Sequence, residues 1–231
     1  MAVNVVYEST DHRAAQDIDA LRQVFEHFTA TSCPRSYNFH LHTTCSDGRL
    51  SPRQVIDQAI ALGLKGLAIT DHHSVRGYDQ AQAYLAQVAP ADSQPRLWTG
   101  MEISAGLLDN EVHILCYGFD PSHTALKPYL QQRAPRGIDY EATQVINAVH
   151  QAGGLAVLAH PDRYRRSPQD LIDTAVTLGI DGVEVFYAYN NPSPWTPSPR
   201  QTQLIQDLAN QYGLLKTGGT DTHGLSLLQR I

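Results

Sequence analysis

The stretch Phe39–Gly48, FHLHTTCSDG, places two histidines two positions apart and an aspartate five residues after the second histidine. Tyr37–His42 has the character of a short strand, in which His40 and His42 would point to the same side. Paired imidazoles at a strand end, followed by a carboxylate, fit a metal site. A polar loop rich in histidine would look the same. Only further ligands elsewhere in the chain can therefore distinguish a metal site from such a loop.

Bulk composition restricts the class of protein. The chain has 231 residues, 42% of them hydrophobic, and a net charge of −6, which fits one large domain or at most two small ones. The acidic balance argues against a broad nucleic-acid-binding face, although a small basic patch could still hold a phosphate. Three widely spaced cysteines, the lack of a signal peptide and the lack of a long apolar run predict a cytoplasmic protein without a membrane segment. No feature indicates a protein partner.

Short apolar segments alternate with longer helical segments from residue 35 onward. The predicted strands are Tyr37–His42, Gly66–Thr70, Leu97–Ile103, Glu111–Tyr117, Leu155–His160, Gly182–Tyr187 and Leu214–Gly219. Strands alternating with helices of 10–15 residues indicate an α/β protein with a parallel sheet covered by helices. Seven such strands favour a TIM-like barrel over an open sheet.

Residues 1–34 precede this pattern. The apolar spacing within Asp11–Phe28 predicts one amphipathic helix, packed outside the main body and ended by Cys33-Pro34. We therefore expect an N-terminal helical extension, residues 1–34, and a barrel domain, residues 35–231.

Side chains that can bind metals recur at the predicted carboxyl ends of the strands. They are His40, His42, Asp71, His72, Glu102, His113, His160, Asp221 and His223, with Asp47 in the loop after the first strand. In a barrel of parallel strands these ends converge on the face that carries the active site. Each residue alone has a plainer explanation, such as a capped core histidine or a glutamate paired with an arginine. Burying so many titratable groups together without a cation is costly, so the cluster predicts a multinuclear metal centre.

Two neighbours of these residues stay open. His73 directly follows His72, and a surface position suits it at least as well as a place near the site. Cys45 is better explained as a small loop residue than as a ligand of a soft metal. The chain contains no GxxxxGK[ST], no GxSxG elbow and no GxGxxG after a strand, so nucleotide-fuelled, serine-hydrolase and dinucleotide-binding functions lack support.

Six motifs carry a family resemblance: FHLHTTCSDG, LAITDHHSVRGY, GMEIS, VHILCYG, LAHPDRY and GGTDTHG, in this order over residues 37–224. With them the chain resembles the PHP (polymerase and histidinol phosphatase) family of metal-dependent phosphoesterases. The resemblance implies a distorted (β/α)7 barrel with two or three divalent ions of manganese, iron or zinc.

The resemblance also implies how the ligands divide. One metal would take His40, His42, Glu102 and Asp221, a second Glu102, His113 and His160, and a third Asp47, His72 and His223. All nine positions carry side chains that can bind metal, which favours a working enzyme. Asp120–Gly137, in contrast, is shorter than the insertion of the related nucleotide phosphatases, which puts their substrate preference in doubt.

The implied chemistry is attack on phosphorus by a hydroxide that the metals activate. Asp71 is expected to orient a ligand histidine. A protonated His72, His73 or His223 could serve the leaving group, although a histidine that binds metal cannot easily do both. Arg163, Arg165 and Arg166 form the nearest basic cluster; a phosphate grip and a solvated loop explain them equally well.

The resulting prediction is a phosphoesterase that hydrolyses a phosphate monoester of a nucleotide, a nucleoside bisphosphate or the 5′ end of a short RNA. A histidinol-phosphate-type phosphatase is an alternative, as is a non-catalytic metal-stabilised binding domain. A metal-dependent amidohydrolase also uses HxH, but it typically bridges its metals with a carboxylated lysine. The lysines here, Lys65, Lys127 and Lys216, are not at the carboxyl ends of predicted strands.

Overall fold

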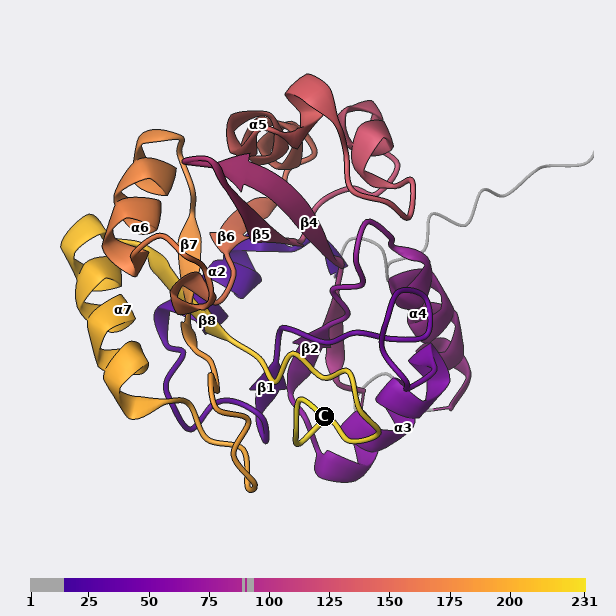
Figure 1. Cartoon of the computed structure of the whole chain (residues 1–231). Helices are drawn as coiled ribbons and strands as arrows, with labels where there is room; N and C mark the ends of the chain where they lie inside the picture. The colour runs from indigo at the N-terminus through magenta and orange to yellow at the C-terminus, as the bar shows by residue number, and fades with distance from the viewer. Residues whose placement is uncertain (1–14, 89, 91–93) are drawn as a thin grey trace, which may run out of the picture.

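Eight strands form two sheets in the computed structural model, which describes residues 15–88, 90 and 94–231 (Figure 1). A parallel three-stranded sheet contains β1 (Tyr37–Asn38), β2 (Gly66–Ala68) and β3 (Arg96–Trp98). A mixed five-stranded sheet contains β4 (Gly100–Leu107), β5 (Asn110–Tyr117), β6 (Leu155–Leu158), β7 (Gly182–Phe186) and β8 (Leu215–Gly218), in that order. The predicted α/β class is confirmed.

The two sheets meet at their edges without a continuous ladder. Isolated parallel bridges join Leu41 to Thr222, beyond the ends of β1 and β8, and His72 to Glu102, between the end of β2 and the start of β4. The strands therefore surround a common centre, as Figure 1 shows, but they do not close into one TIM-like barrel. The expected closed seven-stranded barrel is not confirmed.

The segment around β4 and β5 differs most from the prediction. The expected strand Leu97–Ile103 is divided at Thr99 into β3 and β4, and β4 pairs antiparallel with β5. Only Leu108 and Asp109 connect the two strands, both with positive φ (52° and 54°). Two such residues make a tight hairpin turn, whereas a parallel connection needs a dozen residues or more. The expectation of an all-parallel sheet was therefore wrong here.

Helices cover the outside of the sheets. They are α3 (Pro52–Leu62), α4 (Arg76–Val88), α5 (Ala142–Gln151), α6 (Pro168–Thr177) and α7 (Pro199–Tyr212), with 3-10 turns η2 (Thr124–Tyr129), η3 (Gly137–Tyr140) and η4 (Pro161–Arg163). Ser51 caps α3 through the backbone N–H of Gln54, and Gly63 ends it with φ +66°. None of the helices in the described part of the chain is long and apolar enough to cross a membrane.

The first described helix, α2 (Ile18–Glu26), belongs to the main core. Leu21 and Phe25 are fully buried in the same apolar cluster as the strands, and the Phe25 ring lies 4.9 Å from that of Phe39. Arg22 pairs with Asp181, which precedes β7, so α2 closes the end of the strands opposite to the histidines. The expectation that this helix packs outside the main body was wrong, because its apolar stripe is what fills that end. Residues 11–14 of the expected helix, and most of the first half of the proposed extension, lie outside the described residues.

Candidate metal centre

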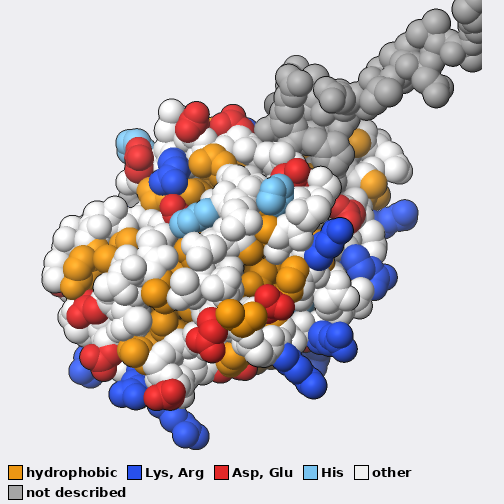
Figure 2. Space-filling view, turned by 90° about the horizontal axis from the view of Figure 1, so that it is seen from above, with side chains coloured by type: hydrophobic (Ala, Val, Ile, Leu, Met, Phe, Trp, Pro, Cys, Tyr) orange, Lys and Arg blue, Asp and Glu red, His pale blue; other side chains and the backbone are white. Residues whose placement is uncertain are grey.

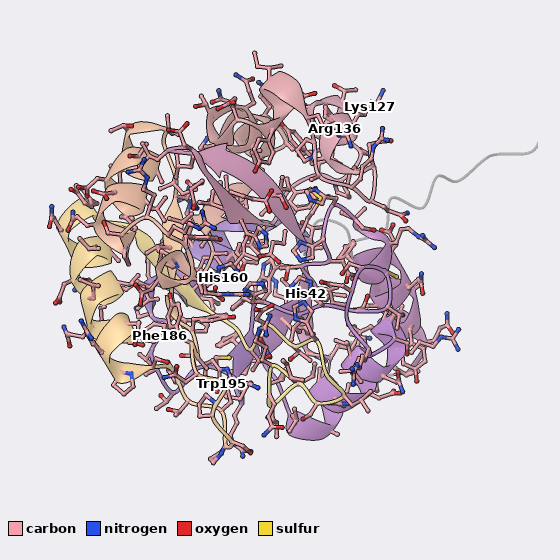
Figure 3. All side chains as sticks on the ribbon, viewed as in Figure 1. His42, Lys127, Arg136, His160, Phe186 and Trp195 are labelled. Carbon is pink, nitrogen blue, oxygen red and sulfur yellow. The ribbon has the colours of Figure 1, made fainter. Side chains whose placement is uncertain are left out.

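The nine expected ligands gather in one cluster. Overlapping groups of side chains that could hold a metal ion contain His40, His42, Asp47, His72, Glu102, His113, His160, Asp221 and His223. Figure 3 places the labelled His42 and His160 near the middle of the ring of strands. Most of these residues follow the carboxyl ends of β1, β2, β6 and β8, as predicted. Glu102 and His113 instead come from within the antiparallel β4–β5 hairpin.

Glu102 lies at the centre of the cluster and is 1% exposed. Its Oε2 lies 3.2 Å from Nε2 of His40 and 3.0 Å from Nε2 of His42. Its Oε1 lies 2.8 Å from Nδ1 of His113 and 3.4 Å from Nε2 of His160. The two oxygens of one carboxylate thus face two different pairs of imidazoles, which is the geometry of a bridging ligand.

Asp221 faces the first of these pairs from the opposite side. Its Oδ1 lies 3.4 Å from Nε2 of His40 and 3.2 Å from Nε2 of His42. Two imidazole nitrogens and two carboxylate oxygens, all buried, therefore point toward one common position.

The third group lies nearer to solvent. Oδ2 of Asp47 is 3.2 Å from Nε2 of His223 and 3.8 Å from Nε2 of His72, and the Asp47 side chain is 53% exposed. His223 Nδ1 lies 2.8 Å from the backbone carbonyl of Asp221, so Nδ1 donates and Nε2 is left as an acceptor. His42 is also close, with Nδ1 3.4 Å from Oδ1 of Asp47. The third group therefore adjoins the first through the His42 ring.

The donor set fits divalent cations. Both ring nitrogens of His42 are buried and make no hydrogen bond, although two carboxylate oxygens lie within 3.2 Å of Nε2. Buried polar atoms are almost always hydrogen-bonded, so an unpartnered imidazole aimed at carboxylates is the arrangement expected of a cation site. Nδ1 of His160 is buried and unpartnered as well. Mixed imidazole and carboxylate donors suit manganese, iron and zinc.

Electrostatics give the same result. Burial alone would raise the pKa of the Glu102 carboxyl, but His40 and His113 hold it well below its usual range. Burial would lower the pKa of His40, yet the carboxylates of Glu184, Glu102 and Asp221 raise it well above its usual value. At His40 these carboxylates outweigh burial, whereas at His72 and His160 burial prevails and lowers the pKa.

Comparison with known proteins agrees with this geometry. A family model described as PHP domain matches residues 38–169, more than half of the chain. The chain belongs to the PHP domain family. It is 33% identical to a 5′-3′ exoribonuclease of Haemophilus influenzae, over 82% of this chain and 90% of the relative. Over 52% of this chain and 39% of the relative, it is 34% identical to a 3′,5′-nucleoside bisphosphate phosphatase of Chromobacterium violaceum. A Bifidobacterium adolescentis protein classed as a metal-dependent phosphoesterase has a similar structure, with a TM-score of 0.66, 26% identity and coverage of 83% and 88%.

The cluster of nine side chains, called the PHP centre from here on, adjoins a buried carboxylate that was not predicted from the sequence. Glu184, in β7, is 0% exposed; its Oε1 lies 2.9 Å from Nδ1 of His40 and its Oε2 accepts the backbone N–H of His160 at 2.9 Å. A carboxylate behind a ligand histidine fixes the ring orientation and its tautomer. The signal was an acidic residue inside an otherwise apolar strand, GVEVF, which has no role there unless it has a partner.

Oδ2 of Asp221 accepts hydrogen bonds from three side chains. Tyr187 Oη lies 2.7 Å, Arg230 Nε 2.8 Å and Arg163 Nη1 3.2 Å from Oδ2. Arg163 was one of the three expected arginines, whereas Tyr187 and Arg230 were not expected. Arg166 turns away and donates to the carbonyl of Leu108.

Arg165 and Arg166 are both exposed, and within the described part of the chain neither forms a hydrogen bond or an ion pair with the PHP centre. Sequence proximity to His160 therefore identified one of the arginines near the site and missed the other, which returns from residue 230.

Asp71 hydrogen-bonds to the loop after β1 and not to an imidazole ring. Its Oδ1 accepts the backbone N–H of Thr43 at 2.6 Å and the hydroxyl of Ser46 at 2.7 Å, and its Oδ2 accepts the Thr43 hydroxyl at 2.7 Å. The expectation that Asp71 contacts a ligand histidine was wrong, because the carboxylate points at the Thr43–Gly48 turn. Through that turn it positions Asp47.

His73 is buried next to the cluster and lines a cavity of about 260 Å³ together with Asp47 and His72. Its Nε2 lies 3.4 Å from the hydroxyl of Ser104, and its backbone N–H donates to the carbonyl of Glu102. Its backbone is left-handed (φ +51°), as are those of His160 (+26°) and Asp221 (+53°). Strained backbone of this kind is concentrated at functional sites, and three of the residues that show it are in or next to this cluster.

Proposed function

We propose that the PHP centre binds two or three divalent cations and hydrolyses a phosphate ester of a nucleotide or a short RNA. The single observation that carries this proposal is Glu102, whose two carboxylate oxygens face separate pairs of imidazoles. The named activities of the relatives, an exoribonuclease and a nucleoside bisphosphate phosphatase, support a nucleotide or RNA substrate.

The proposed ligand sets come from the family resemblance, and the groups of possible ligands in the structure overlap these sets without matching them: His160 lies with His40 and Asp221, and His72 lies with Glu102 and His113. His40, His42, Glu102 and Asp221 would hold the first ion; Glu102, His113 and His160 the second; Asp47, His72 and His223 the third. The last set is the most exposed and contains one carboxylate, so we expect it to bind its ion most weakly. Divalent ions in such a centre polarise phosphoryl oxygens and allow water to ionise near neutral pH.

The residues around Asp221 are suited to holding the phosphate. Arg163 and Arg230 place guanidinium donors beside the first ligand set, and Arg163 is 39% exposed, so it can reach a bound substrate. Burial and the neighbouring Asp221 raise the pKa of Tyr187, so its hydroxyl stays protonated and donates. Donors placed where negative charge develops stabilise the transition state of phosphoryl transfer.

The cluster contains no lysine that could bridge two metal ions, as an amidohydrolase would need. Lys216 lies in β8 with Nζ 3.0 Å from Oδ1 of Asn210, on the outer side, and Lys65 and Lys127 are exposed. A solved amidohydrolase of Chromobacterium violaceum is similar with a TM-score of 0.65 but 21% identity, a likeness of fold alone. Glu102, and no lysine among the described residues, lies between the two pairs of imidazoles.

A substrate panel tests the proposal. The manganese-loaded protein should release phosphate or nucleotides from p-nitrophenyl phosphate, adenosine 3′,5′-bisphosphate and 5′-phosphorylated oligoribonucleotides, and histidinol phosphate serves as the competing substrate. The absence of turnover with every phosphate ester, at a metal content of two or three ions per chain, would refute it. Hydrolysis of histidinol phosphate alone would replace the substrate class.

A further inference from the structure

The segment that joins η2 to η3 carries a basic hollow outside the metal centre. A cavity of about 490 Å³ is lined by Lys127, Arg133 and Arg136 together with Pro128 and Pro135. Figure 3 shows Lys127 and Arg136 at the outer edge of the molecule, away from the central His42 and His160. Figure 2, which views the molecule from that side, shows several Lys and Arg side chains along its right-hand part.

The three cations have no salt-bridge partner among the residues that the structure describes, and all three are exposed. One carboxylate, Asp139, borders the same hollow, so the lining is net positive. The chain as a whole has a net charge of −6. Three exposed cations against one carboxylate around one concavity of an acidic protein indicate an anionic ligand.

The loop that lines the basic hollow also reaches the metal centre. Gln132 precedes Arg133, and its backbone N–H donates to the carbonyl of His73 at 3.0 Å. Gln132 also lines a second cavity, of about 260 Å³, together with Asp47 and His72. One loop therefore borders the metal centre at Gln132 and the basic hollow at Arg133.

We propose that Lys127, Arg133 and Arg136 bind the sugar–phosphate backbone of an oligonucleotide whose reacting phosphate lies in the PHP centre. The proposal rests on the proposed function and specifies its substrate. A ligand that contacts both places has to extend outward from the centre to the edge of the molecule, as a chain of several nucleotides does (Figure 3). Unpaired Lys and Arg side chains bind phosphates without reading sequence, so the surface should accept any base order.

Kinetics with substrates of different length test this surface. The variant Lys127→Ala/Arg133→Ala/Arg136→Ala should raise KM for a 5′-phosphorylated decaribonucleotide about tenfold or more while kcat changes little. KM for p-nitrophenyl phosphate should stay within twofold. The control variant Lys65→Ala/Arg53→Ala/Arg200→Ala removes the same number of positive charges from exposed positions elsewhere. It should leave KM for both substrates unchanged. A decanucleotide KM that stays the same in the first variant, or rises equally in both, would overturn the proposal.

A binding measurement separates this inference from the activity. Fluorescence anisotropy with a labelled decanucleotide in EDTA should show weaker binding by the first variant than by the control. The wild-type affinity should fall with a salt slope of about −2 on logarithmic axes, as three phosphate contacts predict. If the protein binds the decanucleotide, and the first variant binds it more weakly, but no phosphate ester is hydrolysed, the proposed function is refuted. The proposed binding surface is then still supported. A different outcome is that polyglutamate binds as tightly as the decanucleotide, or that the first variant loses as much affinity for adenosine 3′,5′-bisphosphate as for the decanucleotide. Either result would show a general anion site and contradict the oligonucleotide assignment.

Discussion

The two sides of the metal centre are built by different backbone routes. On the parallel side, His40, His160 and Asp221 follow strand ends and lie in loops that neighbouring strands hold in place. On the hairpin side, Glu102 and His113 project from paired strands, with Glu102 opposite Leu115 in the β4–β5 ladder. The central carboxylate thus comes from a hydrogen-bonded strand pair, whereas the imidazoles of His40 and His160 come from loops. The difference suggests that the hairpin sets the position around which the loops arrange their imidazoles.

The comparison is tested most strongly at Glu102 itself. Glu102→Gln keeps the side-chain volume but removes the charge shared by two imidazole pairs, so we expect metal content to fall to one ion or fewer and kcat to fall by more than about 100-fold, beyond the usual effect of losing an outer-sphere partner. His113→Asn, on the same hairpin, should remove only the second ion. Metal analysis and phosphate release from the same samples measure this. Equal metal loss in the two variants would contradict a bridging role for Glu102.

Glu184 tests the parallel side. It orients the His40 ring and holds the backbone of His160, so Glu184→Gln should weaken metal affinity by about 10–100-fold without changing the ligands. Titration with manganese, followed by isothermal calorimetry, measures the change. Adding excess manganese should restore most of the kcat, which a mere folding defect would not allow. Unchanged affinity would show that His40 needs no support from β7.

The arginines give a smaller effect. Arg230→Ala removes a charge-assisted hydrogen bond beside the phosphate position, so KM should rise about tenfold while metal content stays near that of the wild type. Arg165→Ala and Arg166→Ala are matched controls, because both side chains are exposed and lack recorded contacts with the centre, and their KM should change less than twofold. A larger effect in the controls than in Arg230→Ala would reverse the assignment.

The smallest expected effect lies at the opposite end of the strands. Nε2 of His150 lies 2.7 Å from Oδ2 of Asp181, and this hydrogen bond raises the pKa of His150, while burial opposes the shift. A raised folded-state pKa stabilises the protein below the unfolded pKa of about 6.5 and ceases to do so as pH rises through the folded value. His150→Gln should therefore lower Tm by up to about 3 °C at pH 6 and by less at pH 9, since the ion pair is partly exposed. Thermal unfolding at the two pH values checks the sign; a larger loss at pH 9 would contradict it.

The contrast between the two sides also explains what the sequence could predict. His40, His42 and Asp221 were identifiable because polar residues at the ends of apolar strands have few structural explanations. Glu102 and His113 were predicted as ligands through their motifs, and they do lie in the cluster, but the predicted direction of their strands was wrong. The two-residue connection Leu108–Asp109 contained that information, and the hairpin turn should have taken precedence over the strand count.

Other features depend on tertiary packing. Arg230 reaches Asp221 only because the backbone carbonyl of residue 230 accepts from His223 and Gly224, a contact that no periodicity reveals. The burial of α2 depends on its ring contacts with Phe39, and its amphipathic pattern would look the same on an appended helix. Local patterns predict which face of an element is apolar and leave open the surface against which it packs.

We propose that one buried carboxylate, that of Glu102, joins two metal sites that act on a phosphate ester. The most direct measurement is the metal content per chain and the rate of phosphate release, determined on the same manganese-loaded sample of the wild type and of His42→Ala. We predict two or three ions and measurable turnover in the wild type, and loss of both the first-site ion and the turnover in the variant. Full turnover in His42→Ala, or in wild-type protein stripped of metal by exhaustive chelation, would contradict the account.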